Sequence, residues 1–231
     1  MVQRWDWMTF LHWRYEPDEL RPHLPAGLEV QTFDGSAWVG LLRFRMTVRP
    51  PGVPAIPWLS RFPETNVRTY VRGPDGGAGI WFFSLDAGRL LPAMTGRAGL
   101  ALPYVWADME VTRGDSTVAY RSRRRWPGPR GAAAAVRVEL GPPIARDRVS
   151  PLEDFLVSRF RLYTSAAGRL VSVDAEHDSW PLRQASVVRL DQDVLQADGL
   201  PPPRGAPHAL FSEGVEVRIG RPRRVATPRD R

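Results

Sequence analysis

The sequence predicts a mainly β protein with short helices, in the α+β class, whose strands close into a barrel or stack as a sandwich. Three observations predict this fold. About nine or ten stretches have strand-like composition, turn residues separate them at intervals of about 8 to 12 positions, and the helical patterns between them are short. Because no repeat or linker divides the 231 residues, we expect one domain over 1–217 and an arginine- and proline-rich tail over 218–231 that frays.

The N-terminal quarter predicts a strand, a short helix and a hairpin. Residues 5–14 alternate, with Trp5, Trp7, Leu11 and Trp13 on one parity and Phe10, His12 and Arg14 on the other. Proline is typical of a first helical position, so Pro17 predicts a helix of about two turns that ends at Pro25. The Asp34-Gly35 pair predicts a tight turn between strands 28–33 and 37–48.

Two further hairpins are predicted in the middle of the chain, one of strands 64–72 and 79–85 and the other of strands 103–112 and 116–124. A proline-rich loop at 50–57 precedes the first, and a helical stretch at 89–99 connects the two.

The C-terminal part predicts strands at 135–140, 169–176, 186–190 and 207–219. Ser150 and Glu153 form a capping-box pattern with proline between them, which predicts a helix that continues to about Phe160. A second helix is predicted over 191–198 and ends at Gly199.

Composition excludes several kinds of chemistry. The chain has no cysteine, which excludes disulfides, thiolate metal sites and cysteine nucleophiles. All 32 basic residues are arginine, so no lysine side chain is present to form a Schiff base with a carbonyl substrate. The four histidines show no local metal-binding spacing, and no glycine-rich phosphate loop or G-x-S-x-G elbow occurs. We therefore expect neither a metal nor a cofactor.

The net charge of +7 suggests anionic partners, but the arginines are spread along the chain. The aromatic residues do not alternate with the arginine clusters at 121–125 and 218–231, so we do not expect a nucleic-acid partner. No apolar run reaches the length of a membrane span, and Arg4 and Asp6 interrupt any signal-like segment. We expect a cytoplasmic protein without a membrane partner.

One strand combines unusual polar residues on a single face, namely Glu64, Asn66, Arg68 and Tyr70. Two interpretations remain open at this point. The face lies in water, or it lines a cavity in which each polar group needs a partner from the protein or from a ligand. His12 and Arg14 repeat this pattern on the first strand, and the many tryptophans and phenylalanines would supply apolar walls or simply fill a core.

Several stretches together carry a resemblance that extends over roughly residues 5–217. They are F-L-H-W-R-Y-E-P-D-E-L-R-P-H-L-P-A-G-L-E-V (10–30), W-V-G-L-L-R-F-R-M (38–46), F-P-E-T-N-V-R-T-Y-V (62–71), W-F-F-S-L-D-A (81–87), L-E-D-F-L-V-S-R-F-R-L-Y (152–163) and W-P-L-R-Q-A (180–185). They resemble the YqjF-like family of uncharacterised bacterial proteins (domain of unknown function 2071). That family is similar in fold to acetoacetate decarboxylase, a conical antiparallel β-barrel with its active site inside the cone.

The resemblance also carries implications for the site. Arg14 falls at the position of an active-site arginine of the decarboxylase, and Glu64 falls at one of its two active-site glutamates. The second glutamate falls near Gly88 or Arg89 and is not kept. The catalytic lysine falls near 99–103, where this chain has none, so the resemblance argues against decarboxylation through an imine.

We therefore expect a barrel that binds a small organic molecule with a carboxylate or carbonyl group. Arg14 would hold the anion or carbonyl oxygen, and Glu64 would act as acid, base or hydrogen-bond anchor. The remaining polar lining would be Arg68, Asn66, Tyr70 and His12. Two alternatives are a lysine-free acid/base enzyme (an isomerase, hydrolase or lyase) that uses Glu64 and Arg14, and a non-catalytic structural or interaction barrel. Catalysis and assembly into a homo-oligomer stay open.

Overall fold

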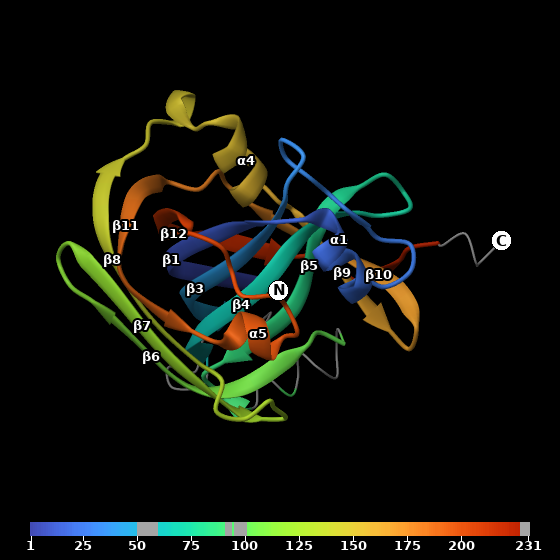
Figure 1. The fold of residues 1–231 in the computed structure, drawn as a ribbon, viewed down its shortest axis with the longest axis horizontal. Helices are drawn as coiled ribbons and strands as arrows, with labels where there is room; N and C mark the ends of the chain where they lie inside the picture. Colours follow the sequence, from blue (N-terminus) through green and yellow to red (C-terminus); the bar gives the residue numbers. More distant parts are fainter. Residues whose placement is uncertain (50–59, 91–93, 95–100, 227–231) are drawn as a thin grey trace.

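The structure is a computed structural model that describes residues 1–49, 60–90, 94 and 101–226. Thirteen strands form one sheet in this part of the chain, and the helices are short (Figure 1). The strands are β1 (Val2–Tyr15), β2 (Glu29–Val30), β3 (Ala37–Arg49), β4 (Arg61–Arg72), β5 (Ala78–Ala87), β6 (Tyr104–Arg113), β7 (Thr117–Trp126), β8 (Ala133–Pro143), β9 (Arg161–Ala166), β10 (Arg169–His177), β11 (Leu182–Gln192), β12 (His208–Ile219) and β13 (Arg223–Arg224). The helices are α1 (Pro17–Leu20), α4 (Pro151–Val157) and α5 (Val194–Ala197), with 3₁₀ turns at Arg21–His23 and Arg146–Arg148.

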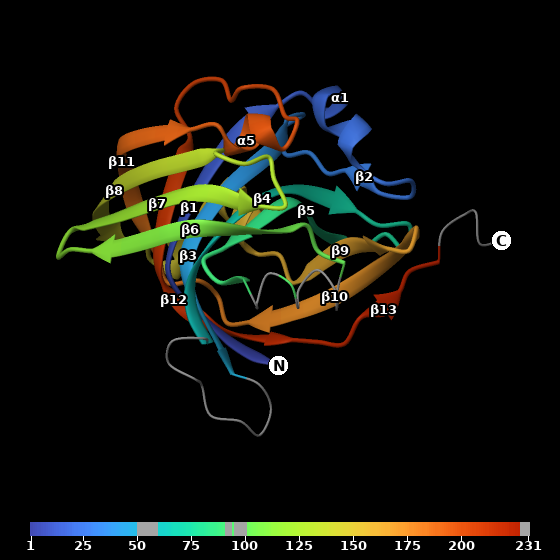
Figure 2. The same ribbon diagram turned by 90° about the horizontal axis from the view of Figure 1, so that it is seen from below.

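The sheet closes on itself twice because two strands each have three partners. β5 pairs with β4, β6 and β9, and β12 pairs with β1, β10 and β11. The strands β5, β4, β3, β1 and β12 are therefore shared by two rings (Figures 1 and 2). We call the ring completed by β6, β7, β8 and β11 the large ring, and the ring completed by β9 and β10 the small ring. The β5–β6 and β5–β9 pairings are parallel, and the pairings along the shared strands are antiparallel.

Each ring has its own hydrophobic core, because successive side chains of a shared strand point to opposite faces. Phe10 and Phe44 lie in the core of the small ring, whereas Leu11 and Val67 lie in that of the large ring. Helix α4 contributes Phe155, Leu156 and Val157 to the small-ring core and so covers part of it.

The first strand contains a bulge that the simple alternation does not predict. The register with β3 shifts between Asp6 and Thr9, and Trp7 has a positive φ of 54°. As a result Trp5 packs against the small-ring core, while Trp7 packs with Leu11 in the large ring. The prediction that Trp5 shares one face with Trp7, Leu11 and Trp13 is therefore wrong for Trp5.

The predicted first hairpin is correct only in its turn. Asp34 and Gly35 have positive φ, and Phe33 and Ser36 form the bridge that closes the turn. Strand β2, however, pairs with β4, because β1 and β4 already occupy both edges of β3.

The expected fraying of the tail from residue 218 is also wrong for its first part. Residues 218 and 219 continue β12, and β13 pairs with Val171 and Ser172 of β10. Val225 is buried and its backbone N–H donates to the carbonyl of Leu170. Backbone pairing and one apolar anchor thus hold the chain as far as Val225.

Most other predicted elements are confirmed. The hairpins of β4 with β5 and of β6 with β7 are present, and α4 begins at the predicted capping box but ends at Val157 rather than Phe160. Strand β9 was not predicted. The proline-rich loop at 50–57 and most of the stretch at 89–99 lie outside the described residues. No helix in the described part of the chain has the length and hydropathy needed to cross a bilayer.

Candidate functional site

The polar face of β4 points into the small ring and is buried. Glu64 is 1% exposed, and Asn66, Arg68 and Tyr70 are likewise buried. His12 of β1 is fully buried on the same face. Of the two interpretations of this strand, the one that places the charged face in water is therefore wrong. We call these five residues the polar row.

The strand register explains how the row is assembled. His12 lies opposite Gly40 of β3, and Gly40 lies opposite Arg68. A Cβ atom at position 40 would come within 2.8 Å of the His12 ring, so glycine makes room for the imidazole to lie over the sheet. The local sequence thus brings His12 beside Arg68 and Tyr70.

At one end of the row, His12, Arg68 and Tyr70 meet the backbone of α4. The Tyr70 hydroxyl donates to the carbonyl oxygen of Leu156 (2.7 Å), and Arg68 Nη2 donates to the same oxygen (3.0 Å). Because the tyrosine has a single hydrogen, His12 Nε2, 2.8 Å away, donates to the tyrosine oxygen. Burial lowers the pKa of His12 well below its usual value, and the charge of Arg68 adds to this. A neutral imidazole with a free acceptor at Nδ1 results.

At the other end, Glu64 is a buried carboxyl group with neutral partners. Tyr104 donates to Glu64 Oε2 (3.3 Å), and the Asn66 amide, turned so that its nitrogen faces acceptors, donates to Glu64 Oε1 (3.0 Å). Burial raises the pKa of Glu64 to about 8, although these two hydrogen bonds act in the opposite direction. Glu64 is therefore protonated at neutral pH and can donate a hydrogen bond or a proton.

The structure does not bring Arg14 and Glu64 together. Arg14 is exposed, and its guanidinium lies over the Trp38 ring, 5.1 Å from the centroid. In the strand register, Arg14 lies opposite Trp38 of β3, and Glu64 lies opposite Phe44 of the same strand. The difference of six residues along β3 corresponds to roughly 20 Å.

Several buried polar atoms without partners lie in the small ring, while Arg43 and Thr65 contribute others on the large-ring face. Among the described residues, His12 Nδ1, Arg68 Nε and the indole nitrogens of Trp38 and Trp180 have no hydrogen-bond partner. Each unpaired buried polar group costs about 1–3 kcal/mol. One acceptor and three donors of the small ring are therefore without a protein partner among the described residues.

Sequence reasoning missed two residues of this site. Tyr104 stands at the start of β6, and it reaches Glu64 only because β6 pairs in parallel with β5. His208 lies opposite His12 on β12, and its Nε2 is 3.7 Å from Glu153 Oε1. Both contacts join distant parts of the chain, so neither has a local signal in the sequence.

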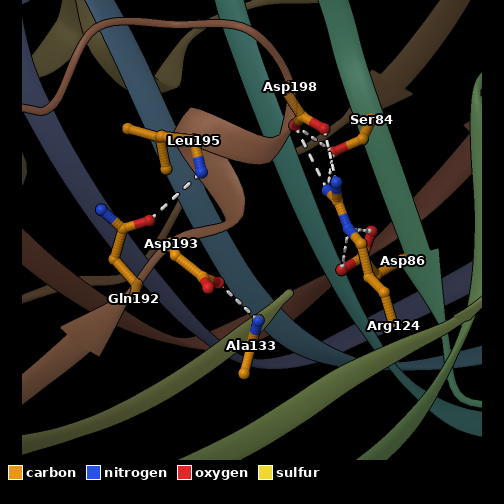
Figure 3. Close-up of polar contacts among 8 residues, drawn as sticks. All are labelled: Ser84, Asp86, Arg124, Ala133, Gln192, Asp193, Leu195 and Asp198. Carbon is orange, nitrogen blue, oxygen red and sulfur yellow. Dashed lines mark hydrogen bonds and ion pairs between the residues drawn. The ribbon is translucent and has the colours of Figure 1, made fainter. Parts of the chain in front are cut away.

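The large ring contains a different buried arrangement, an ion-pair network (Figure 3). Arg124 Nε donates to both oxygens of Asp86 (2.9 and 3.0 Å), Nη1 donates to Asp198 (2.6 Å) and Nη2 donates to Ser84 (2.5 Å). Arg124 and Asp86 are each 1% exposed. Burial raises the pKa of Asp86 to about 6 against the opposing effect of Arg124. Every nitrogen of this guanidinium is paired, so the network connects β5, β7 and the segment after α5.

Comparison with known proteins places the fold and the family. The family model DUF2071, described as an uncharacterized conserved protein, matches residues 2–216. The uncharacterized protein YqjF of Bacillus subtilis (strain 168) is 35% identical over 218 residues, which cover 94% of this chain and 89% of that protein.

Among solved structures, the enduracididine biosynthesis enzyme MppR with HEPES buffer bound has a TM-score of 0.69 at 13% identity, over 97% of this chain and 87% of that one. MppR has also been solved in complex with pyruvate, with a TM-score of 0.67 at 14% identity, over 97% and 90% of the two chains. Acetoacetate decarboxylase from Legionella pneumophila has a TM-score of 0.68 at 14% identity, over 98% and 88%. At these identities the likeness establishes the acetoacetate-decarboxylase-like fold.

Proposed function

We propose that this chain, which belongs to the DUF2071 family of uncharacterized conserved proteins, binds a small organic molecule with a carboxylate or carbonyl group in the small ring. Glu64 is the observation that supports this most strongly. Its carboxyl group is buried and, among the described residues, accepts hydrogen bonds only from the neutral groups of Tyr104 and Asn66. Such a group adds little to folding, whereas it suits a site that recognises or protonates a ligand oxygen.

In this proposal each residue of the polar row has a role. Protonated Glu64 donates to a ligand oxygen or transfers a proton to it, and Asn66 lies beside it. Arg68 lies four residues along β4, roughly 13 Å away, and its unpaired Nε is the buried cation donor on this face. Arg68 therefore takes the anion-holding role that the sequence suggested for Arg14. His12 Nδ1 accepts a hydrogen bond from the ligand, and Tyr70 holds His12 in that tautomer.

The ligand class follows from these donors. Glu64 suits a carbonyl oxygen and Arg68 a carboxylate, and because roughly 13 Å separates them along β4, the two together suit an oxo acid longer than pyruvate. Pyruvate, which MppR binds in one of its solved structures, has this combination of a carboxylate and a carbonyl. A reaction of such a ligand here would not form an imine with a lysine side chain, because the chain has no lysine. A pKa of about 8 at Glu64 suits proton transfer near neutral pH. The expected cytoplasmic location remains a prediction.

Native mass spectrometry of protein purified from its own host, followed by thermal melts with pyruvate and the longer oxo acid 2-oxoadipate, tests this proposal. We expect a retained small molecule, or a higher melting temperature with at least one of the two oxo acids. Glu64→Gln and Arg68→Gln should abolish that stabilisation, and Arg14→Ala, outside the ring, should keep it. Absence of any retained or stabilising compound, or full stabilisation of Glu64→Gln, would refute the proposal.

A second candidate is a non-catalytic structural or interaction protein. The small-ring core contains many aromatic side chains, including Phe10, Trp38, Phe44 and Phe155. In this alternative the residues of the polar row only form hydrogen bonds within the protein and bind no ligand. Glu64→Gln would then change stability and leave every ligand measurement unchanged.

A further inference from the structure

A large groove lies on the outer face of β6 and β7, apart from the polar row. It has a volume of about 1020 Å³, and its lining includes Trp106, Asp108, Arg123, Arg125, Trp126 and Arg130. Arg123 and Arg125 point away from the large-ring interior, whereas Arg124 between them points inward. The volume matches the upper end of the range of small-molecule sites.

Apolar side chains are unusually exposed in this groove. Trp126 and Leu90 are each 42% exposed, and Met94 is 49% exposed. These three line the same groove as the half-buried indole of Trp106. Large apolar side chains that gather at one exposed place mark a binding surface rather than a random part of the protein exterior.

The charge around these indoles is positive. Asp108 forms an ion pair with Arg125, so these two charges cancel. Within the part of the chain that the structure describes, Arg123 and Arg130 have neither a carboxylate partner nor a side-chain hydrogen bond, and both are exposed. Arg124 forms ion pairs with Asp86 and Asp198 on the other side of the sheet, so its charge does not add to that of the groove. The groove therefore offers two uncompensated guanidinium groups beside two indole rings.

We propose that this groove binds a planar aromatic anion, such as an aromatic carboxylate. Indole rings stack on a flat apolar ring, and a guanidinium binds a carboxylate through two parallel hydrogen bonds. A second copy of this chain fits less well, because two identical positive faces would repel each other.

The groove is a separate site from the polar row, although it borders it. Trp106 pairs with Ala87, and Ala87 pairs with Glu64. Glu64 does not line the groove, so the inference does not rest on the function proposed for the small ring.

The same surface provides a matched control. A smaller cavity of about 380 Å³ lies on β6, β7 and β8, and Arg121 and Arg137 line it without any aromatic residue. These two exposed arginines match Arg123 and Arg130 in number but lack the indoles, and Glu110 in the same lining lies opposite Arg121 much as Asp108 lies opposite Arg123.

Isothermal titration of the full chain with 2-naphthoate, and with the neutral naphthalene-2-carboxamide, tests the assignment. We expect one site for 2-naphthoate and binding of the amide that is weaker by about tenfold or more, because the amide lacks the charge that arginine recognises. Trp126→Ala should weaken naphthoate binding about tenfold through loss of stacking, and Trp126→Phe should restore part of it. The Arg123→Ser/Arg130→Ser double variant should also weaken it and reduce its salt dependence.

The control variant Arg121→Ser/Arg137→Ser should bind 2-naphthoate like the original chain, and so should Glu64→Gln. Equal binding of the acid and the amide would overturn the proposal, as would an unchanged affinity of Trp126→Ala. Equal losses in the two double-arginine variants would show attraction to net charge alone. Tighter binding of single-stranded DNA than of naphthoate at physiological salt would assign the groove to nucleic acid instead.

Discussion

Glu64 and Asp86 show how a partner determines the behaviour of a buried carboxyl group. They lie on adjacent strands one level apart, on opposite faces of the sheet, and both are buried. Arg124 limits the rise in the pKa of Asp86, which reaches about 6, whereas Glu64 has neutral partners and its pKa reaches about 8. Asp86 thus belongs to an ion pair, and Glu64 is left as a neutral acid facing the small ring.

This difference predicts a pH effect of Glu64→Gln. Between about pH 4.5 and 8 the folded protein keeps a proton on Glu64 that the unfolded chain releases, so this group lowers the free energy of unfolding as pH rises. Glutamine does not titrate, so the variant does not show this decrease in the free energy of unfolding. We expect the stability of the original chain relative to Glu64→Gln to fall by a few kcal/mol from about pH 5 to pH 8.5, measured by urea unfolding.

Contributions from His12 and Asp86 are common to both proteins and cancel in this difference. Glu139→Gln, an exposed substitution on β8, should follow the pH profile of the original chain. A pH-independent difference between the original chain and Glu64→Gln would show that Glu64 is ionised or hydrated in the folded state.

The alternation of β4 was enough to predict which residues share a face, but it could not predict their partners. Glu64, Arg68 and His12 lie on one face as the sequence indicated. The resemblance placed Arg14 in the same site. In the structure, however, Arg14 and Glu64 lie opposite residues of β3 that are six positions apart. Tyr104 supplies the contact to Glu64 through a parallel pairing that no local pattern encodes.

At the scale of elements, α4 connects local sequence to the site. Ser150 Oγ accepts from the backbone N–H of Glu153 (3.2 Å), and Glu153 Oε2 accepts from the N–H of Ser150 (2.8 Å). This capping box, visible in the sequence, sets where the helix begins. The buried side of α4 then supplies the Leu156 carbonyl oxygen, which accepts hydrogen bonds from Tyr70 and Arg68. Elements with such local signals were predicted well, whereas β2 and β9 depend on which strand edge is free.

Ser150→Ala should therefore reduce the free energy of unfolding by about 1 kcal/mol, the usual cost of losing an N-cap. It should also speed hydrogen exchange of the α4 amides, because the helix loses its anchor. Urea unfolding and exchange measured by mass spectrometry give both values. Ser186→Ala, at an exposed position of β11, serves as the control, and equal effects of the two substitutions would contradict the role of the cap.

At the scale of the whole molecule, two rings share five strands, so each shared strand serves two interiors. The small ring contains the polar row with unpaired donors, and the large ring contains the Arg124 network, in which the charges are paired. The strand count and the resemblance predicted a closed sheet. The branching at β5 and β12 could not be predicted, because it depends on pairings between residues far apart, such as Ile80 with Leu162.

The Arg124 network predicts a larger stability effect than loss of the α4 cap. Arg124→Met would remove the hydrogen-bonded cation that Asp86 and Asp198 share, leaving Asp86 only the more distant charge of Arg43, and breaking such a buried pair typically costs about 3–5 kcal/mol. Arg123→Met, at the adjacent position on the outer face, should change stability by no more than about 0.5 kcal/mol. The loss in Arg124→Met should shrink from pH 7 to about pH 5, since the raised pKa of Asp86 lets this carboxyl group take up a proton and lose its charge. Urea unfolding of both variants at the two pH values measures this, and equal losses would mean that the network does not hold the large ring closed.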